Sequence, residues 1–206
     1  LANLDGKPLA DPRLIKFQTG VRAEIWRNNV YAIGLSSGFL EPLESTSIHL
    51  IQTAIDRLLT YLTAGEPDAA TRAHCNRSAR REMESIRDFI ILHYTANGRE
   101  GEAFWDQLRY MPLPDSLSHR IAMFRASARV VREAEELFDV PGWVQVMVGQ
   151  GIVPTGWSPL ADQLTDAQLD GFLATIRSGF TQDVARMPAH DEFIRHFAPA
   201  AQAVAA

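Results

Sequence analysis

The sequence predicts a mainly α-helical chain with a small β portion at its beginning. After Ser45, apolar residues recur at spacings of three and four, which is the period of an amphipathic helix. Before residue 34, short apolar or alternating runs are separated by Asp-Gly, Thr-Gly and Asn-Asn, which favour tight turns between strands. We therefore expect strands and a turn over residues 1–44, helices over residues 45–198 and a frayed Ala-rich tail over residues 199–206.

The β portion is expected to contain three short strands, over residues 14–17, 21–26 and 30–33. The third run is mostly apolar, so we expect it to be buried and to lead into a tight turn at Gly34. Glycine suits such a turn because it adopts backbone conformations that other residues avoid.

The first expected helix ends near Gly65, and its apolar stripe consists of Ile48, Ile51, Ile55, Leu58, Leu59 and Leu62. A second helix is expected over residues 70–96, because Asn97-Gly98 then stops it. A short helix over residues 103–110 should follow.

Three further helices are expected in the second half of the chain. Asp115 or Ser116 can cap one whose apolar stripe is Leu117, Ile121, Phe124, Val131 and Leu137. Thr165 and Gln168 have the spacing of a capping box, and the helix that they open carries Leu169, Phe172, Leu173, Ile176 and Phe180. The last, short helix should cover residues 189–197.

The longest uncharged run, residues 140–161, has the length of a membrane-spanning helix. It contains three Pro, four Gly and two Gln, which argue against a continuous helix facing lipid. We expect this run to be irregular chain that is buried or lines a pocket, and we expect no membrane span.

Composition excludes several functional classes. The 20 Lys and Arg against 25 Asp and Glu give a net charge of −5, whereas non-specific nucleic-acid binding and polybasic membrane anchoring need an excess of cations. The single cysteine, Cys75, excludes an internal disulfide and a multi-cysteine zinc site, and it indicates a reducing, cytoplasmic location. The six His show no paired ligand spacing, so no metal is expected.

Residues 26–52 carry the features that best suit a chemical site. An expected strand enters the turn at Gly34, and the chain then passes Glu44 into a helix N-terminus. The free N–H groups and the positive dipole end of such an N-terminus attract anions, and an adjacent carboxylate can act as a general base. The alternative is ordinary capping by Ser45 or Thr46, with Glu44 favourably placed near the dipole.

Residues 34–38 (GLSSG) also fit G-x-S-x-G, the nucleophile elbow of serine hydrolases. That elbow requires a helix directly after the serine, whereas residues 39–44, with Pro42 among them, intervene here. A serine hydrolase is therefore a remote alternative.

Residues 32–46 (AIGLSSGFLEPLEST) strongly resemble the signature of the flavin-dependent tryptophan halogenase family. The resemblance extends over roughly residues 1–162, through the blocks at residues 3–6, 17–22, 87–94, 111–117 and 145–151. It implies that this chain is the C-terminal helical part of a flavin-monooxygenase-like α+β fold, without the N-terminal dinucleotide-binding unit.

The resemblance also implies a reaction and its residues. Such enzymes use reduced FAD from a separate flavin reductase, oxygen and chloride or bromide to make hypohalous acid. A lysine and a glutamate then direct halogenation of an electron-rich aromatic such as tryptophan or indole. Glu44 matches that glutamate.

The remaining matches in the signature concern the halide and the flavin. Thr46 and Ser47 match halide-binding positions, although the tryptophan-specific members carry Gly in place of Ser47. Gly34, Leu35 and Ile48 match cofactor-binding positions.

Two tryptophans are candidates for contact with an aromatic substrate. Trp143 and Trp157 lie in the uncharged run and have the flat apolar rings that stack on an indole. Buried packing is the alternative for both.

Two parts of the family pattern are absent from the sequence. No G-x-G-x-x-G occurs, and neither Lys7 nor Lys16 lies in surroundings that match the catalytic lysine. We therefore expect this chain to be a fragment that is inactive alone. Oligomeric state does not follow from the sequence, and the resemblance implies a homodimer. The alternatives are a non-catalytic homologous fragment or interaction domain, and a flavin hydroxylase.

Overall fold

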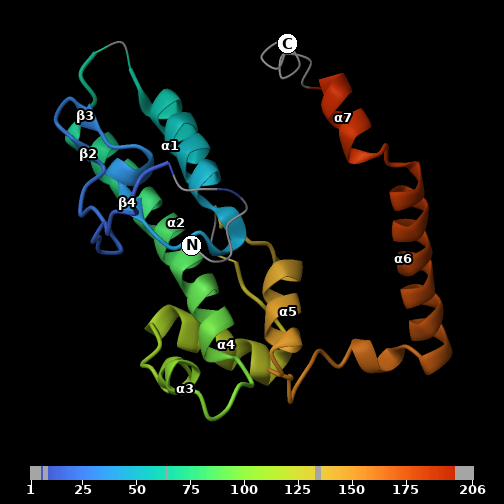
Figure 1. Ribbon diagram of the computed structural model, residues 1–206. Helices are drawn as coiled ribbons and strands as arrows, with labels where there is room; N and C mark the ends of the chain where they lie inside the picture. Colours follow the sequence, from blue (N-terminus) through green and yellow to red (C-terminus); the bar gives the residue numbers. More distant parts are fainter. Residues whose placement is uncertain (1–5, 7–8, 64, 133–135, 198–206) are drawn as a thin grey trace. The chain divides into compact units, whose positions relative to one another are not determined.

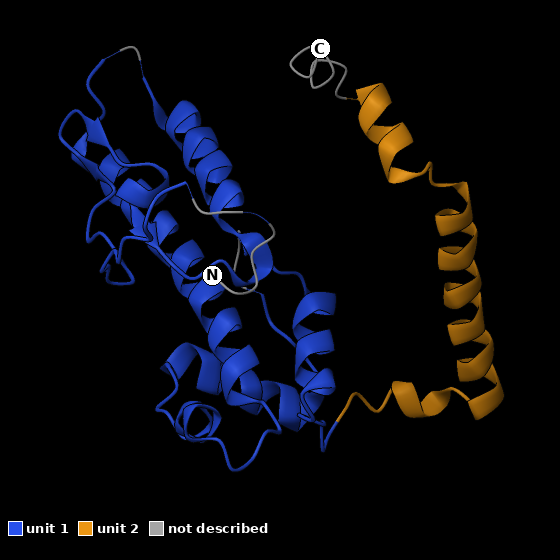
Figure 2. Ribbon diagram, viewed as in Figure 1, with its two compact units in different colours: residues 1–156 blue, residues 157–206 orange. Residues whose placement is uncertain are grey.

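The computed structural model describes Gly6 and residues 9–63, 65–132 and 136–197. It divides into two compact units, residues 1–156 and residues 157–206 (Figure 2), and each is described by itself. Most of the described residues are helical, as the sequence predicts. The expected frayed tail over residues 199–206 lies outside the described residues, and so does Lys7.

The β portion of the first unit consists of two separate antiparallel ladders (Figure 1). In the first ladder β1 (Gly20–Val21) pairs with β4 (Gly38–Phe39). In the second, β2 (Trp26–Arg27) pairs with β3 (Val30–Tyr31). Each strand has two residues, so the ladders need other elements to hold them in place.

None of the three strand predictions is confirmed as made. Residues 21–26 do not form one strand, because Val21 pairs in the first ladder, Trp26 pairs in the second, and residues 22–25 form no strand. Residues 14–17 are exposed and form no strand. The run over residues 30–33 is not a buried strand, because only Val30 and Tyr31 pair and Val30 is 64% exposed. The physical reason is that a two-stranded ladder covers neither of its own faces, so an apolar run does not by itself ensure burial.

The side chain of Asn76 fixes the second ladder to helix α2 (Ala69–Thr95). Its Oδ1 accepts hydrogen bonds from the backbone N–H groups of Ile25 and Trp26, each at 2.9 Å. Its Nδ2 donates to the carbonyl oxygen of Trp26 at 3.1 Å. Ile25 and Trp26 are buried, so this amide supplies partners that their backbone would otherwise lack.

Helix α1 (Ser47–Tyr61) lies beside α2 (Figure 1), and a buried ion pair joins the two helices. Nη2 of Arg57 lies 2.8 Å from Oε2 of Glu82, and Nε2 of His49 lies 3.4 Å from Oε1 of the same carboxylate. Burial lowers the pKa of Arg57, but its hydrogen bond to Glu82 and the charge of Glu82 outweigh that effect and raise it. Arg57 therefore stays cationic, and α1 is held in place on α2.

The core of the first unit lies where α2 meets α4 (Asp115–Ser127) and α5 (Val140–Gly149). A short helix, α3 (Ala103–Arg109), packs on α2 as well. The buried members of this core are Phe89, Leu92, Leu117, Ile121, Phe124, Val130, Trp143, Met147 and Ile152.

Two expectations for this region are wrong. The helix predicted to reach Leu137 ends at Ser127, because Ala128 adopts a left-handed conformation (φ 56°) that stops it. The run over residues 140–161 is not wholly irregular, because its first half is α5. Pro141 lies in the first turn of α5, where its missing N–H breaks no helical bond.

The second unit contains α6 (Asp166–Arg186) and α7 (His190–Phe197). The capping box predicted for Thr165 and Gln168 is confirmed, since each side chain bonds to the backbone N–H of the other residue. In the part of the chain that the structure describes, no helix has the length and apolar character to cross a membrane.

Candidate functional site

A strained turn lies directly before helix α1. Glu44 has φ 65° and Ser45 has φ 55°, so two consecutive residues other than glycine are left-handed. Such a conformation costs roughly 1–2 kcal/mol per residue, because Cβ approaches the following carbonyl oxygen. Strain of this kind persists only where the surroundings hold it, and it gathers at functional sites. The strained turn therefore indicates that the positions of the side chains in residues 43–46 matter for function.

The N-terminus of α1 follows this turn with little side-chain capping. Thr46 is the N-cap residue, and its side chain makes no capping hydrogen bond, although Thr46 itself is buried. The capping interpretation of the sequence is therefore not realised by Thr46. Ser47 is exposed at the first helical position. The first N–H groups of α1 and the positive end of its dipole are thus suited to an anion.

The carboxylate of Glu44 faces the side chain of His93, near the end of α2. Oε1 of Glu44 lies 3.3 Å from Nε2 of His93. The other ring nitrogen, Nδ1, lies 2.8 Å from the carbonyl oxygen of Phe89. Because a carbonyl oxygen only accepts, Nδ1 is the donor in this hydrogen bond, and Nε2 is the ring nitrogen that faces Glu44. The Glu44 side chain is 42% exposed, which leaves it accessible to a ligand.

His93 connects this carboxylate to the core. Its ring meets the ring of Phe89 edge to face at 4.9 Å between centroids. Phe89 in turn stacks on Phe138 at 3.8 Å and meets Trp143 edge to face at 4.8 Å. His93 is therefore held both by a backbone hydrogen bond and by a packed aromatic cluster.

The turn at Gly34 presents an open surface next to α1. Gly34 has φ 63°, and a Cβ at this position would lie 3.2 Å from Cγ1 of Ile51. Leu35 is 77% exposed and Ile48 is 71% exposed. Exposed apolar side chains beside a free helix N-terminus suit a flat, partly apolar group that carries or neighbours an anion.

The geometry does not match a nucleophile elbow. The hydroxyl of Ser36 donates to the carbonyl oxygen of Ile33 at 2.9 Å and accepts from the N–H of Ile33 at 3.1 Å. Ser36 ends a 3-10 turn (Gly34–Ser36), which leads into β4 and not into a helix. The serine therefore stabilises its own turn.

The two tryptophan candidates lie in different surroundings. Trp143 is fully buried in the core, with the guanidinium of Arg120 4.1 Å above its ring, as the packing alternative expects. Trp157 opens the second unit, is 57% exposed, and its Nε1 donates to Oδ1 of Asp162 at 2.7 Å.

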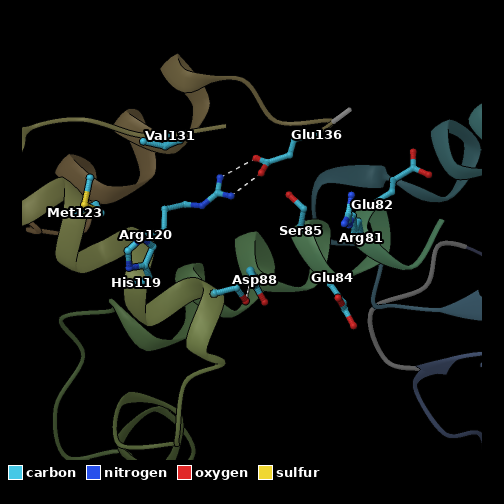
Figure 3. A pocket seen from close by; sticks show the side chains of 11 residues that line it. Arg81, Glu82, Glu84, Ser85, Asp88, His119, Arg120, Met123, Val131 and Glu136 are labelled. Atoms are coloured by element: carbon cyan, nitrogen blue, oxygen red, sulfur yellow. Dashed lines mark hydrogen bonds and ion pairs between the residues drawn. The ribbon is translucent and has the colours of Figure 1, made fainter. Parts of the chain in front are cut away.

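A separate hollow of about 260 Å³ is lined largely by residues of α2 and α4. Figure 3 shows the side chains that line it. Arg120 and Glu136 form a two-pronged ion pair there, with N–O distances of 2.6 and 2.7 Å. Asp88 accepts a hydrogen bond from Ser116 in the same lining. None of the residues expected at a site lines this hollow. Among the described residues no three His, Cys, Asp or Glu side chains gather as a metal site would require.

Sequence reasoning missed His93 as a partner of Glu44. In the sequence, His93 is one of six histidines without paired ligand spacing. The available signal was the block at residues 87–94, which resembles the same family, but spacing alone does not reveal which side chain meets Glu44.

Comparison with known proteins identifies the family. The family profile described as tryptophan halogenase matches residues 1–166, which is most of the chain. This chain belongs to the tryptophan halogenase family. Among curated members, 7-chloro-L-tryptophan 6-halogenase KtzR of Kutzneria sp. is 30% identical over 186 residues, covering 87% of this chain and 36% of that protein.

Two solved halogenase structures resemble the chain over more of its length. Xcc4156, a flavin-dependent halogenase from Xanthomonas campestris, is 47% identical with a TM-score of 0.85, covering 95% of this chain and 40% of that one. BrvH, a flavin-dependent halogenase from Brevundimonas sp. BAL3, is 41% identical with a TM-score of 0.80, covering 93% and 39%. The chain thus spans well under half the length of these family members.

Proposed function

We propose that this chain supplies the halide site and a catalytic glutamate to a flavin-dependent halogenase that acts on an electron-rich aromatic such as tryptophan or indole. The observation that carries this proposal is the strained turn at Glu44 and Ser45, directly before the N-terminus of α1. It supports the proposal because the turn and the helix N-terminus bring a carboxylate and an anion-attracting end next to each other.

The residues around Gly34 fit a flavin, and those at the start of α1 fit a halide. Leu35 and Ile48 offer apolar contact, while Gly34 has no side chain to fill the turn. Thr46 and Ser47 would hold chloride or bromide through the N–H groups of the helix N-terminus. When bound, reduced FAD would give two electrons to oxygen, which takes two more from the halide and so turns it into an electrophilic halogen.

Glu44 would act on the aromatic substrate. Replacing a ring hydrogen by an electrophilic halogen releases a proton, and a carboxylate within reach of the ring can accept it. His93 would hold the carboxylate of Glu44 in position, because its Nε2 lies 3.3 Å from Oε1 of Glu44. A lysine that assists this step, and a dinucleotide-binding unit that retains FAD, would come from the rest of the enzyme.

The remaining roles follow from this proposal. The first 44 residues would lead to the flavin and halide, and the helices after residue 45 would form the substrate side. A separate flavin reductase would supply the reduced cofactor, and the enzyme would be a cytoplasmic homodimer. Trp157 remains a candidate for contact with the substrate. This chain alone would bind FAD weakly and halogenate nothing.

The test uses the full-length protein with reduced FAD, oxygen, bromide or chloride, and tryptophan or indole. We expect a halogenated product, and we expect Glu44→Gln to lower its rate of formation by about 100-fold or more, since general bases contribute about 10²–10⁴ to rates. Glu102→Gln is the matched control, because Glu102 is exposed and makes no side-chain cap. A hydroxylated product that forms without halide would contradict the proposal.

A further inference from the structure

The last turn of α2 makes two separate contacts with the segment that carries Glu44. His93 reaches Glu44, and its neighbour Tyr94 donates a hydrogen bond from its hydroxyl to Oε1 of Glu41 at 2.5 Å. The two contacted carboxylates lie on either side of Pro42 and Leu43. Two consecutive residues of one helix therefore hold both ends of a four-residue segment whose first residue, Glu41, precedes Tyr94 by 53 residues in the sequence.

Tyr94 is itself held from the side of α3. Its ring stacks on the ring of Trp105 at 5.9 Å with an interplanar angle of 22°. The guanidinium of Arg99 lies 4.8 Å from the centroid of the same Trp105 ring. The hydroxyl that meets Glu41 is thus carried by a ring with few alternative positions.

We propose that Tyr94 and Glu41 are positioning residues, whose hydrogen bond holds the strained turn so that Glu44 points its carboxylate into the catalytic site. The inference rests on the proposed function of Glu44. Two left-handed residues in a row would relax toward an ordinary conformation unless the chain on both sides were fixed. After the turn, helix α1 fixes the chain at Thr46. Before the turn, the Glu41–Tyr94 hydrogen bond fixes it at Glu41.

The chemistry of the bond agrees with this role. The hydrogen bond to Glu41, with burial and the negative charge of Glu41 adding to it, raises the pKa of the Tyr94 phenol above its ordinary value. Tyr94 therefore stays a donor at neutral pH, and the acceptor is a charged group, which makes the hydrogen bond stronger than a neutral one.

The experiment compares Tyr94→Phe, Glu41→Leu and their double variant in the full-length protein. Each single variant should lower kcat by roughly ten- to hundredfold, the effect of a small displacement of a catalytic group, with KM for the aromatic changed much less. The double variant should lose no more than either single variant, because both remove one bond. Glu41→Gln keeps an acceptor oxygen and should restore most of the rate. Tyr110→Phe is the control, since Tyr110 is 79% exposed.

Amide hydrogen exchange over residues 41–48 gives a readout that does not need turnover. Tyr94→Phe and Glu41→Leu should speed exchange in that segment, whereas Tyr110→Phe should leave it unchanged. Unchanged exchange, or additive losses of kcat in the double variant, would overturn the positioning role. If the unaltered protein makes no halogenated product, the proposed function fails, and the exchange result still decides whether the bond holds the turn.

Discussion

Asn76→Ala should loosen the β portion, because this side chain makes three hydrogen bonds to the backbone of Ile25 and Trp26. Both residues are buried, so water has little access to the N–H groups that lose their acceptor. A buried polar group left without a partner costs about 1–3 kcal/mol, and at about 1–2 kcal/mol for each of the two N–H groups we expect a total of roughly 2–4 kcal/mol for local opening.

The assay is amide hydrogen exchange at Ile25 and Trp26. A loss of that size corresponds to exchange that is about 30- to 700-fold faster at these two amides, since each 1.4 kcal/mol is tenfold. Asn76→Asp keeps the two acceptor bonds and loses the donor, so it should cost roughly 1–2 kcal/mol. Asn29→Ala, at an exposed residue of the turn that joins the two strands of this ladder, is the control. Exchange at Ile25 and Trp26 that is unchanged in Asn76→Ala would refute the reasoning.

Three further changes have defined outcomes. His93→Phe removes the partner of Glu44 but keeps an aromatic ring in the core. The halogenation rate of the full-length protein should therefore fall at least tenfold, while the melting temperature changes little. A large drop in melting temperature together with the loss of rate would show that His93 is only structural. The pKa of Tyr94 is raised in the folded chain. The stability that its hydrogen bond to Glu41 gives the fold is therefore fully present below about pH 10, and it is lost as pH rises through the folded pKa. Ultraviolet titration should show the pKa of the Tyr94 phenol falling in Glu41→Leu, with Tyr94→Phe identifying which transition belongs to Tyr94, and no change would contradict the hydrogen bond. Gly34→Ala should destabilise the chain by about 1–2 kcal/mol in urea unfolding, because alanine is strained at φ 63° and its Cβ would press on α1; a stabilised variant would argue against that turn.

The long helices of this fold could be predicted from the sequence, because each carries local signals at its ends. α2 (Ala69–Thr95) lies within a residue of the predicted bounds at both ends, since Asn97-Gly98 stops it. α6 begins where its capping box predicts. The end of α4 could not be predicted, because the left-handed Ala128 that ends it has no sequence signal. Alanine is a strong helix former.

The site could be predicted only in part. The signature at residues 32–46 indicates Glu44 and the start of α1, and the structure shows a strained turn there that no composition or periodicity predicts. The partners of this turn, His93 and Tyr94, come from the far end of another helix. Such contacts depend on how α1 and α2 pack, and sequence spacing carries no information about that packing.

The most direct test of the account is the halide dependence of product formation by the full-length protein and by its Glu44→Gln variant. With reduced FAD, oxygen, bromide and indole, mass spectrometry should detect a brominated product that disappears when bromide is omitted and that Glu44→Gln forms at least about 100-fold more slowly. Bromination at the unaltered rate by Glu44→Gln, or an oxygenated product that forms equally well without bromide, would contradict the account.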